Sequence, residues 1–346
     1  MNLLPLLTAA LLAAALPTLA RAKEATPDPV AVGAGFDAAQ QADKLFKIAE
    51  AQAFKGVTRV AVPLFTVEFV TADSVSAQTS GFAAAGRSNV SVHYALKGVA
   101  EPELQALTDQ LYADFLRDLK AAGIDVLPQS QLQASSIYRK LAAGGSPAPI
   151  KSDSAMTLAP PGMAIYGFSK SSAGTGGGSS LFGALSAMAS GFSAVGAVLE
   201  TVELQKELAA AIVEVQMRVH FVQLTNNNKG FLGRMATSAS VDAQVLPTIT
   251  SASMSVQSST RGSLTLSNPL ALDATAFAEV RSAPTTAGDV AGAVLVGLIR
   301  LASRSGDSSS SNSMEAVADP ARYRAVVGAG LGTVSQMFVH RLRSGL

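Results

Sequence analysis

The chain has 346 residues, of which 48% are hydrophobic and 15% charged, so it can bury a sizeable core in one large or two modest domains. Its 26 basic and 25 acidic residues include no long run of one sign, which excludes the electrostatic footprint of a nucleic-acid-binding protein. It contains no cysteine, which excludes disulfides, thiol chemistry and a lipid-modified amino-terminal cysteine.

The first residues predict a secretory signal peptide over residues 1–22. A short apolar run over residues 3–16 is broken by Pro17, and Ala20-Arg21-Ala22 fits the small-x-small rule for cleavage. The alternative is an uncleaved membrane anchor, which the shortness of the run disfavours. The sequence therefore predicts export to the periplasm or to a place associated with the outer membrane.

The strongest local pattern is a capped amphipathic helix over residues 101–123. Pro102 suits its first turn, and Gly123 suits a left-handed exit from its end. Residues 124–127 then predict a strand that stops at Pro128. The apolar side chains of the helix recur at three- and four-residue spacing and share one face: Leu104, Leu107, Leu111, Phe115, Leu119 and Ala122.

Upstream of this unit, residues 23–56 predict a loose leader followed by a helix over residues 37–54. Residues 57–70 predict a strand that lies at a sheet edge, or breaks, at Pro63. The polar residues 71–89 predict a long loop, and residues 91–98 predict a second short strand.

Downstream, residues 130–141 predict a second helix and residues 163–169 a short strand. A Gly/Ala-rich insertion over residues 174–199 then interrupts the core. Within it, Gly183, Ala187 and Gly191 are four residues apart, a spacing of small residues that permits close helix packing. We interpret these three residues as a partner or oligomer contact. Membrane contact through residues 181–199 is the disfavoured alternative.

Residues 211–224 alternate between apolar and polar side chains and predict the clearest strand of the chain. A polar turn at residues 226–230 and a second alternating run over residues 235–245 complete a long antiparallel hairpin. Residues 253–266 predict a further strand or hairpin. These elements close a predicted α/β core domain over residues 57–273.

Residues 274–346 predict a carboxy-terminal helical segment. Its helices are expected over residues 274–283, 288–303 and 321–343, and a Ser-rich solvated linker over residues 305–313 separates the last two.

No motif predicts a catalytic, metal or cofactor site. His93, His220 and His340 are far apart, and none has a second ligand at metal-binding spacing. There is no GxSxG motif to mark a nucleophilic serine. The glycines at residues 328–332 lie in a helical pattern and follow no strand, so close packing explains them better than a dinucleotide loop. The sequence therefore predicts a protein that is not an enzyme and needs no cofactor.

The order of these elements resembles the curli secretion channel subunit (CsgG) family and its relatives, which include the amino-terminal domain of TolB. The segments GVTRVAVPLF, LTDQLYADFLRDLKAAGIDVLPQSQL, AIYGFSK and AIVEVQMRVHFVQLTNNNKGFL carry this resemblance, which spans about residues 57–245. It implies an α/β (α+β) fold: a mixed sheet with two flanking helices and a long antiparallel hairpin, to which we add the carboxy-terminal helices. It also implies that no catalytic residue is to be expected.

We therefore expect a non-catalytic exported envelope protein that binds protein partners in the assembly or secretion of a cell-surface structure. Its partners would be other envelope proteins or further copies of the chain, not nucleic acid. The first alternative is an oligomeric outer-membrane secretion pore of the curli-channel type. The second is a secreted serine hydrolase whose site no motif marks.

Overall fold

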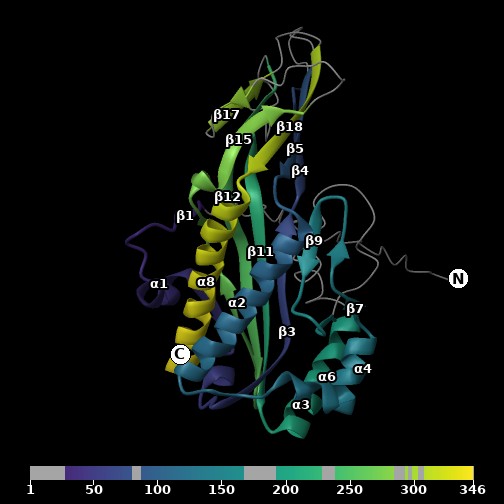
Figure 1. The fold of residues 1–346 in the computed structure, drawn as a ribbon, viewed down its shortest axis with the longest axis vertical. Coiled ribbons are helices and arrows are strands. Elements are labelled where there is room, and N and C mark those ends of the chain that lie inside the picture. The colour runs from purple at the N-terminus through teal and green to yellow at the C-terminus, as the bar shows by residue number, and fades with distance from the viewer. Residues whose placement is uncertain are drawn as a thin grey trace, which may run out of the picture.

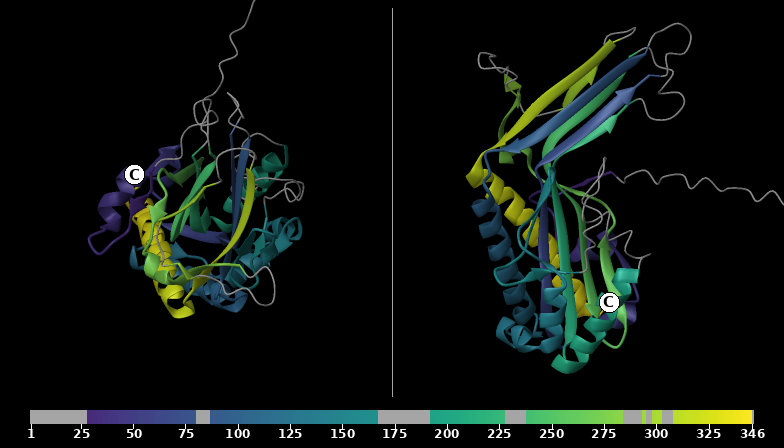
Figure 2. Two further views of the ribbon diagram at one scale, coloured as in Figure 1. Left: turned by 90° about the horizontal axis from the view of Figure 1, so that it is seen from above. Right: turned by 90° about the vertical axis from the view of Figure 1, so that its right-hand side faces the viewer.

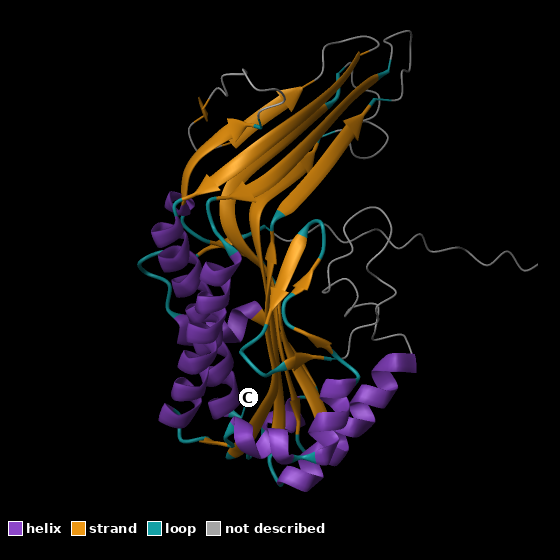
Figure 3. Ribbon diagram, turned by 45° about the vertical axis from the view of Figure 1, so that its right-hand side comes forward, coloured by secondary structure: helices purple, strands orange, loops and turns teal. Residues whose placement is uncertain are grey.

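The computed structural model describes residues 28–79, 87–166, 192–227, 238–283, 293–294, 298–302 and 308–345, and the side chains of residues 192–198, 293–294, 298 and 308 are not described. Figure 1 shows an elongated molecule with two parts. We call the lower part, in which helices pack on a large sheet, the body. We call the upper part, a five-stranded sheet, the arm. In Figure 3 the long helices lie in the body, and the arm is made of strands.

The body contains an eleven-stranded mixed sheet and the long helices. Its strands are β1 (Val30–Ala31), β2 (Phe46–Ala49), β3 (Arg59–Val70), β6 (Asp125–Val126), β8 (Ile150–Lys151), β9 (Ala155–Leu158), β11 (Ala211–Asn226), β12 (Ser240–Gln257), β13 (Arg261–Leu266), β14 (Leu270–Ala271) and β17 (Leu298–Ala302). Its helices are α1 (Ala38–Leu45), α2 (Glu101–Ala121), α3 (Gln129–Ala134), α4 (Ser136–Ala143), α6 (Phe192–Leu208) and α8 (Pro320–Ser344). Short 3-10 turns η1 (Ala51–Phe54) and η4 (Ala274–Ala276) and the small pair β7 (Ser146–Pro147) and β10 (Ala164–Ile165) complete it.

The centre of the body sheet is the predicted long hairpin, β11–β12, together with β3. β11 pairs antiparallel with β12 and parallel with β3, so the sheet is mixed as expected. Strand pairing is interrupted at Pro63, in agreement with the predicted edge or break. The β3–β11 register shifts between Ile212 and Glu214, so neither Val62 nor Pro63 is paired with β11. On the other side of β3, β6 pairs only with Arg59–Val60 and β9 only with Val67–Val70.

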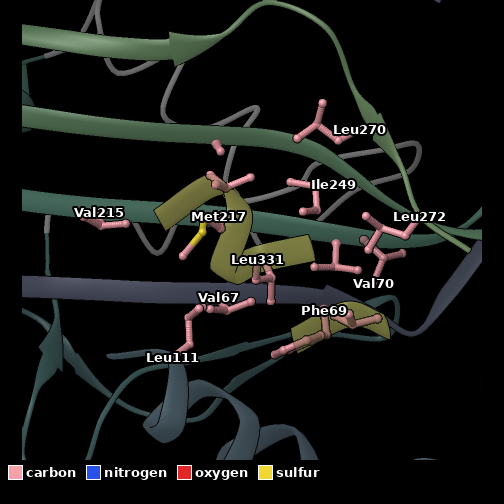
Figure 4. Close-up of a cluster of buried hydrophobic side chains, with 14 of the residues drawn as sticks. Val67, Phe69, Val70, Leu111, Val215, Met217, Ile249, Leu270, Leu272 and Leu331 are labelled. Carbon is pink, nitrogen blue, oxygen red and sulfur yellow. The ribbon is translucent and has the colours of Figure 1, made fainter. Parts of the chain in front are cut away.

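The main core lies between this sheet and two helices, α2 and α8. Figure 4 shows Leu111 of α2 and Leu331 of α8 beside Val67, Val215 and Met217 of the sheet. Five of the six predicted apolar residues of α2 are buried, which confirms the predicted face: Leu104, Leu107, Leu111, Phe115 and Leu119. These contacts give the body its stability, because each fully buried aliphatic or aromatic side chain contributes about 1.5–3 kcal/mol.

Two of the three glycines at residues 328–332, Gly328 and Gly330, serve close packing as expected, whereas nothing lies within 4 Å of a Cβ added at Gly332. A Cβ added at Gly330 would lie 2.5 Å from a methyl carbon of Leu272, and one at Gly328 would lie 3.1 Å from a methyl carbon of Leu107. The predicted helix over residues 321–343 is confirmed as α8, whose first turn is capped by Asp319 accepting from the Arg322 N–H.

The arm consists of β4 (Ala72–Gln78), β5 (Ser88–Lys97), β15 (Phe277–Ser282), β16 (Ala293–Val294) and β18 (Ser308–Ala318), in the order β16-β15-β18-β5-β4. It leans over the upper ends of β11 and β12, as the right-hand view of Figure 2 shows. β17 belongs to the body sheet through its pairing with the first residues of β12, and it lies in the upper part of the molecule (Figure 1). β5 leads into α2 and β18 leads into α8, so the two main helices of the body each follow an arm strand.

Several predicted boundaries are wrong. The predicted helix over residues 37–54 ends at Leu45, because Phe46–Ala49 pairs with β13 as strand β2. The predicted helix over residues 130–141 is split, since Ser135 leaves the helical conformation and caps α4 by accepting from the Tyr138 N–H. The strand expected over residues 163–169 is described only as Ala164–Ile165. The predicted loop 71–89 contains β4 and the first residues of β5.

The carboxy-terminal segment differs most. Residues 277–282 form β15, and a register shift between Phe277 and Glu279 places Phe277 and Val280 on the same face. This bulge gives a strand the three-residue apolar spacing of a helix. In the predicted helix over residues 288–303, the described residues form β16 and β17, of which β17 pairs with β12. Most of the predicted linker belongs to β18, which pairs with β5 over this part and with β15 only from Met314 onwards.

Candidate functional site

The outer face of the arm carries a regular grid of small hydroxyl side chains. Strand pairing places Ser76, Ser91 and Ser311 in one cross-strand row. The next row joins Ser74, His93 and Ser313 in the same way. Neighbouring strands lie about 4.8 Å apart and alternate residues about 7 Å apart, so the hydroxyls form a flat array. We call this surface the serine face: Ser74, Ser76, Ser91, His93, Ser309, Ser311 and Ser313.

The serine face is open to solvent, whereas the opposite face of the same strands is buried. Six of its seven residues are exposed and Ser91 is half-buried. Between them, Val90, Val92 and Tyr94 of β5 are buried together with Ala316 of β18. This inner face packs towards β11 and β12 of the body. The apolar inner face therefore attaches the arm to the body, and the polar serine face is exposed to solvent.

A cavity of about 470 Å³ lies where the arm meets the body. Its walls come from strands of both sheets and from the ends that join them. The lining residues are Val70, Ala72, Asp73, Ser74, His93, Tyr94, Ala95, Lys97, Ser154, Arg218, His220, Ala283, Ser313, Met314 and Glu315.

A buried ion pair forms beside this cavity. Arg218 on β11 is opposite Glu68 on β3, and its Nε lies 3.5 Å from Glu68 Oε1. The side chain of Glu68 is only 3% exposed, and burial raises its pKa despite the opposing charge of Arg218. One carboxylate oxygen of Glu68 has no hydrogen-bond partner. The pair is thus incompletely satisfied, which is costly for buried charges.

A second pair joins the arm to the body. His220 Nε2 on β11 lies 3.4 Å from Asp73 Oδ2 on β4, and His220 Nδ1 accepts from the Val222 N–H at 3.4 Å. Burial and the nearby positive charge of Arg218 lower the pKa of His220 to about 4. Burial raises the pKa of Asp73, although the hydrogen bond that it accepts from the Ser74 N–H acts to lower it. His220 is therefore neutral at pH 7 and donates through Nε2.

Another polar network lies lower in the body and has its partners in place. Glu214 accepts from the Tyr166 hydroxyl at 3.0 Å, from Ser255 Oγ at 2.9 Å and from Arg261 Nη2 at 2.8 Å. Burial, followed by the charge of Glu214, raises the pKa of Tyr166 well above its usual range. A satisfied network of this kind fixes strand positions and leaves no bonding capacity for a ligand.

The predicted contact residues Gly183, Ala187 and Gly191 lie outside the described residues. Over the described ranges, no group of three or more His, Asp or Glu residues could hold a metal ion, and no helix is long and apolar enough to cross a membrane. Both ring nitrogens of His220 are engaged, by Asp73 and by the Val222 N–H, so neither of them faces a serine hydroxyl.

Comparison of the chain with protein-family models, with curated proteins and with solved structures finds no match. The resemblance to the curli secretion channel family therefore stays an expectation from the order of elements. The α+β fold class does not depend on that resemblance, because the structure shows the mixed sheet, the flanking helices and the long hairpin directly.

Sequence reasoning missed both the serine face and the cavity. Both depend on β4, β5 and β18, and residues 71–89 and 305–313 were expected to be loop and linker. One signal was present: residues 89–94 read NVSVHY, in which Val90, Val92 and Tyr94 alternate with polar side chains. For β18 the signal was weak, since its first residues are four serines.

Proposed function

We propose that this protein is a non-catalytic exported envelope protein that binds protein partners in the assembly or secretion of a cell-surface structure. The observation that carries the proposal is the serine face, an open sheet surface presented by a strand arm that projects from a helix-braced body. The signal-peptide pattern of residues 1–22 supports export.

The chemistry of the serine face suits contact with another protein. Serine hydroxyls both donate and accept, so one flat surface can bond to backbone or side-chain groups of a partner. Short side chains lose little rotamer entropy when a partner orders them. The exposed large apolar residues among those described, Ile48 and Leu199, belong to β2 and α6, away from this face. A polar interface without large apolar anchors favours reversible association.

Photo-crosslinking in the envelope of a Gram-negative host tests the proposal. The full chain would carry a photoreactive amino acid at Ser76 or Ser311 on the serine face, and the control would carry it at Ala106, an exposed residue of α2. We expect defined adducts from the two serine-face positions and none from Ala106, with the partner identified by mass spectrometry.

Adducts between copies of the chain would identify the partner as the chain itself. Equal labelling at Ala106 and at the serine-face positions, or none at any of them, would contradict the proposal.

A further inference from the structure

The cavity between arm and body contains polar atoms whose bonding capacity is unused. Arg218 Nε and the Tyr94 hydroxyl are both buried and have no hydrogen-bond partner, and both residues line the cavity. Glu68 Oε2, behind Arg218, is unbonded as well. Buried polar groups in folded proteins almost always have a partner. Two unsatisfied donors in the lining, Arg218 Nε and the Tyr94 hydroxyl, therefore indicate that this cavity accommodates a polar ligand.

The cavity has unused hydrogen-bond donors. Arg218 lies near two carboxylates, Glu68 and Asp73, but its Nε has no hydrogen-bond partner. Lys97, an exposed lining residue, forms no ion pair within the described ranges. The other lining carboxylate, Glu315, is paired with Arg281 at 2.9 Å. An anionic group that accepts hydrogen bonds from Arg218 and Tyr94 would satisfy these donors.

The same residues indicate which anion fits. A guanidinium presents a planar fork of donors that matches a carboxylate in two parallel hydrogen bonds. Glu68 and Asp73 lie close to Arg218, and their charges would repel a dianionic phosphate more strongly than a monoanion. A single carboxylate therefore suits the site better than a phosphoryl group.

We propose that this cavity binds a carboxylate group, with Arg218 as its principal partner and the Tyr94 hydroxyl as a second donor. Two sources share this chemistry: a free small carboxylic acid, and the carboxyl terminus of a peptide chain that enters the cavity. The serine face and the cavity share Ser74, His93 and Ser313, but the proposal rests on Arg218 and Tyr94, which are not part of that face.

Calorimetric titration of the full chain at pH 7 and low salt tests it with three probes. N-acetyl-glycyl-glycine supplies a terminal carboxylate, its carboxamide is identical except for that group, and acetate supplies the carboxylate alone. We expect N-acetyl-glycyl-glycine to bind and the carboxamide to bind at least tenfold more weakly. Acetate binding as tightly as the peptide identifies a small acid as the ligand, and weaker acetate binding identifies a peptide terminus.

Two variants tie binding to the named residues. Tyr94→Phe removes only the unbonded hydroxyl and should weaken binding two- to tenfold while the fold is kept. The double variant Glu68→Gln with Arg218→Gln removes both charges of the pair together and should weaken binding at least tenfold. Arg117→Gln, on the exposed surface of α2, is the control and should bind as the original chain does.

Equal affinity for the peptide and its carboxamide, or no binding of either, would overturn the proposal. Full affinity in the Tyr94→Phe variant and in the double variant would overturn it too. If the double variant does not fold, the affinity of Tyr94→Phe alone tests the proposal, and full affinity in that variant would overturn it.

Discussion

The body and the arm are both built on long strands, but they are stabilised in different ways. In the body, α2 and α8 cover one face of the sheet with large apolar side chains such as Phe115 and Leu331. In the arm, no described helix covers the sheet, and the small side chains Val92 and Ala316 face inwards below an open serine face. The difference shows that helices cover one face of the body sheet, whereas the arm leaves its serine face open to solvent.

The first prediction concerns the largest expected effect, in the core of the body. Phe115→Ala should lower the free energy of unfolding by about 3–5 kcal/mol, because it removes a fully buried ring between α2 and β3. Chemical denaturation monitored by circular dichroism measures the change. A loss below about 1 kcal/mol would mean that α2 does not brace the sheet as described.

The second prediction tests the joint between the two parts. Gly98 lies between β5 and α2 with φ of 85°, and an added Cβ would meet the carbonyl of Ala318 at the end of β18. Gly98→Ala should therefore cost about 2–4 kcal/mol, from left-handed strain and from the backbone contact together. The measurement is again chemical denaturation.

Gly56 supplies a matched control, since its φ is 67° and nothing lies within 4 Å of an added Cβ. Gly56→Ala should lower the free energy of unfolding only by the cost of left-handed strain, about 1–2 kcal/mol. Equal losses in the two variants would contradict the close approach of β5 and β18 at the joint.

The third prediction concerns the pH dependence of the pair that links arm and body. Folding lowers the pKa of His220 from 6.5 to about 4, so its contribution to stability is fully present above pH 6.5 and is lost as the pH falls to 4. The raised pKa values of Glu68 and Asp73 act in the opposite direction, because protonating these carboxyls relieves a cost of the folded state. The histidine contribution amounts to up to about 3 kcal/mol.

The variant His220→Gln isolates this contribution. Between pH 7 and pH 4 the original chain should lose more unfolding free energy than the variant, by up to about 3 kcal/mol. His93→Gln, on the exposed serine face, is the matched histidine control. Parallel pH profiles for the original chain and His220→Gln would show that His220 is not buried at the joint.

The fourth prediction compares two neighbouring residues of the arm. Val92→Ala should cost about 1–3 kcal/mol because Val92 is fully buried on the inner face. Ser91→Ala, one residue away on the serine face, should change stability by less than about 0.5 kcal/mol. Thermal unfolding of the two variants measures the contrast. Similar effects would mean that β5 does not separate an inner from an outer face.

The sequence predicted the body better than the arm for a physical reason. The face of α2 was visible because residues such as Leu111 and Phe115 are large and recur at helical spacing, and the hairpin was visible because Val213 and Val215 alternate with polar residues. In the arm, the first residues of β18 are four serines, so the alternation of that strand is faint. The serines of β18 resemble a linker, although parallel pairing with β5 makes the segment a strand.

The polar groups at the cavity were harder still to foresee. Glu68, Arg218 and His220 lie on two strands, and only the register of β3 with β11 places Glu68 beside Arg218. Asp73 reaches His220 because β4 continues from β3 into the arm. Such pairings depend on contacts between distant segments, which spacing within one segment does not reveal.

Amide hydrogen exchange of Ser308–Ala318 tests the central claim most directly, because the serine face exists only if this segment is strand β18. We expect the amides of Met314–Ala318, which lie between β5 and β15, to exchange as slowly as those of β5. Ser308–Ser313 pairs with β5 alone, so we expect slow exchange there at the amides that bond to β5. Complete exchange within seconds, as in a solvated linker, would contradict both the arm and the function proposed for it.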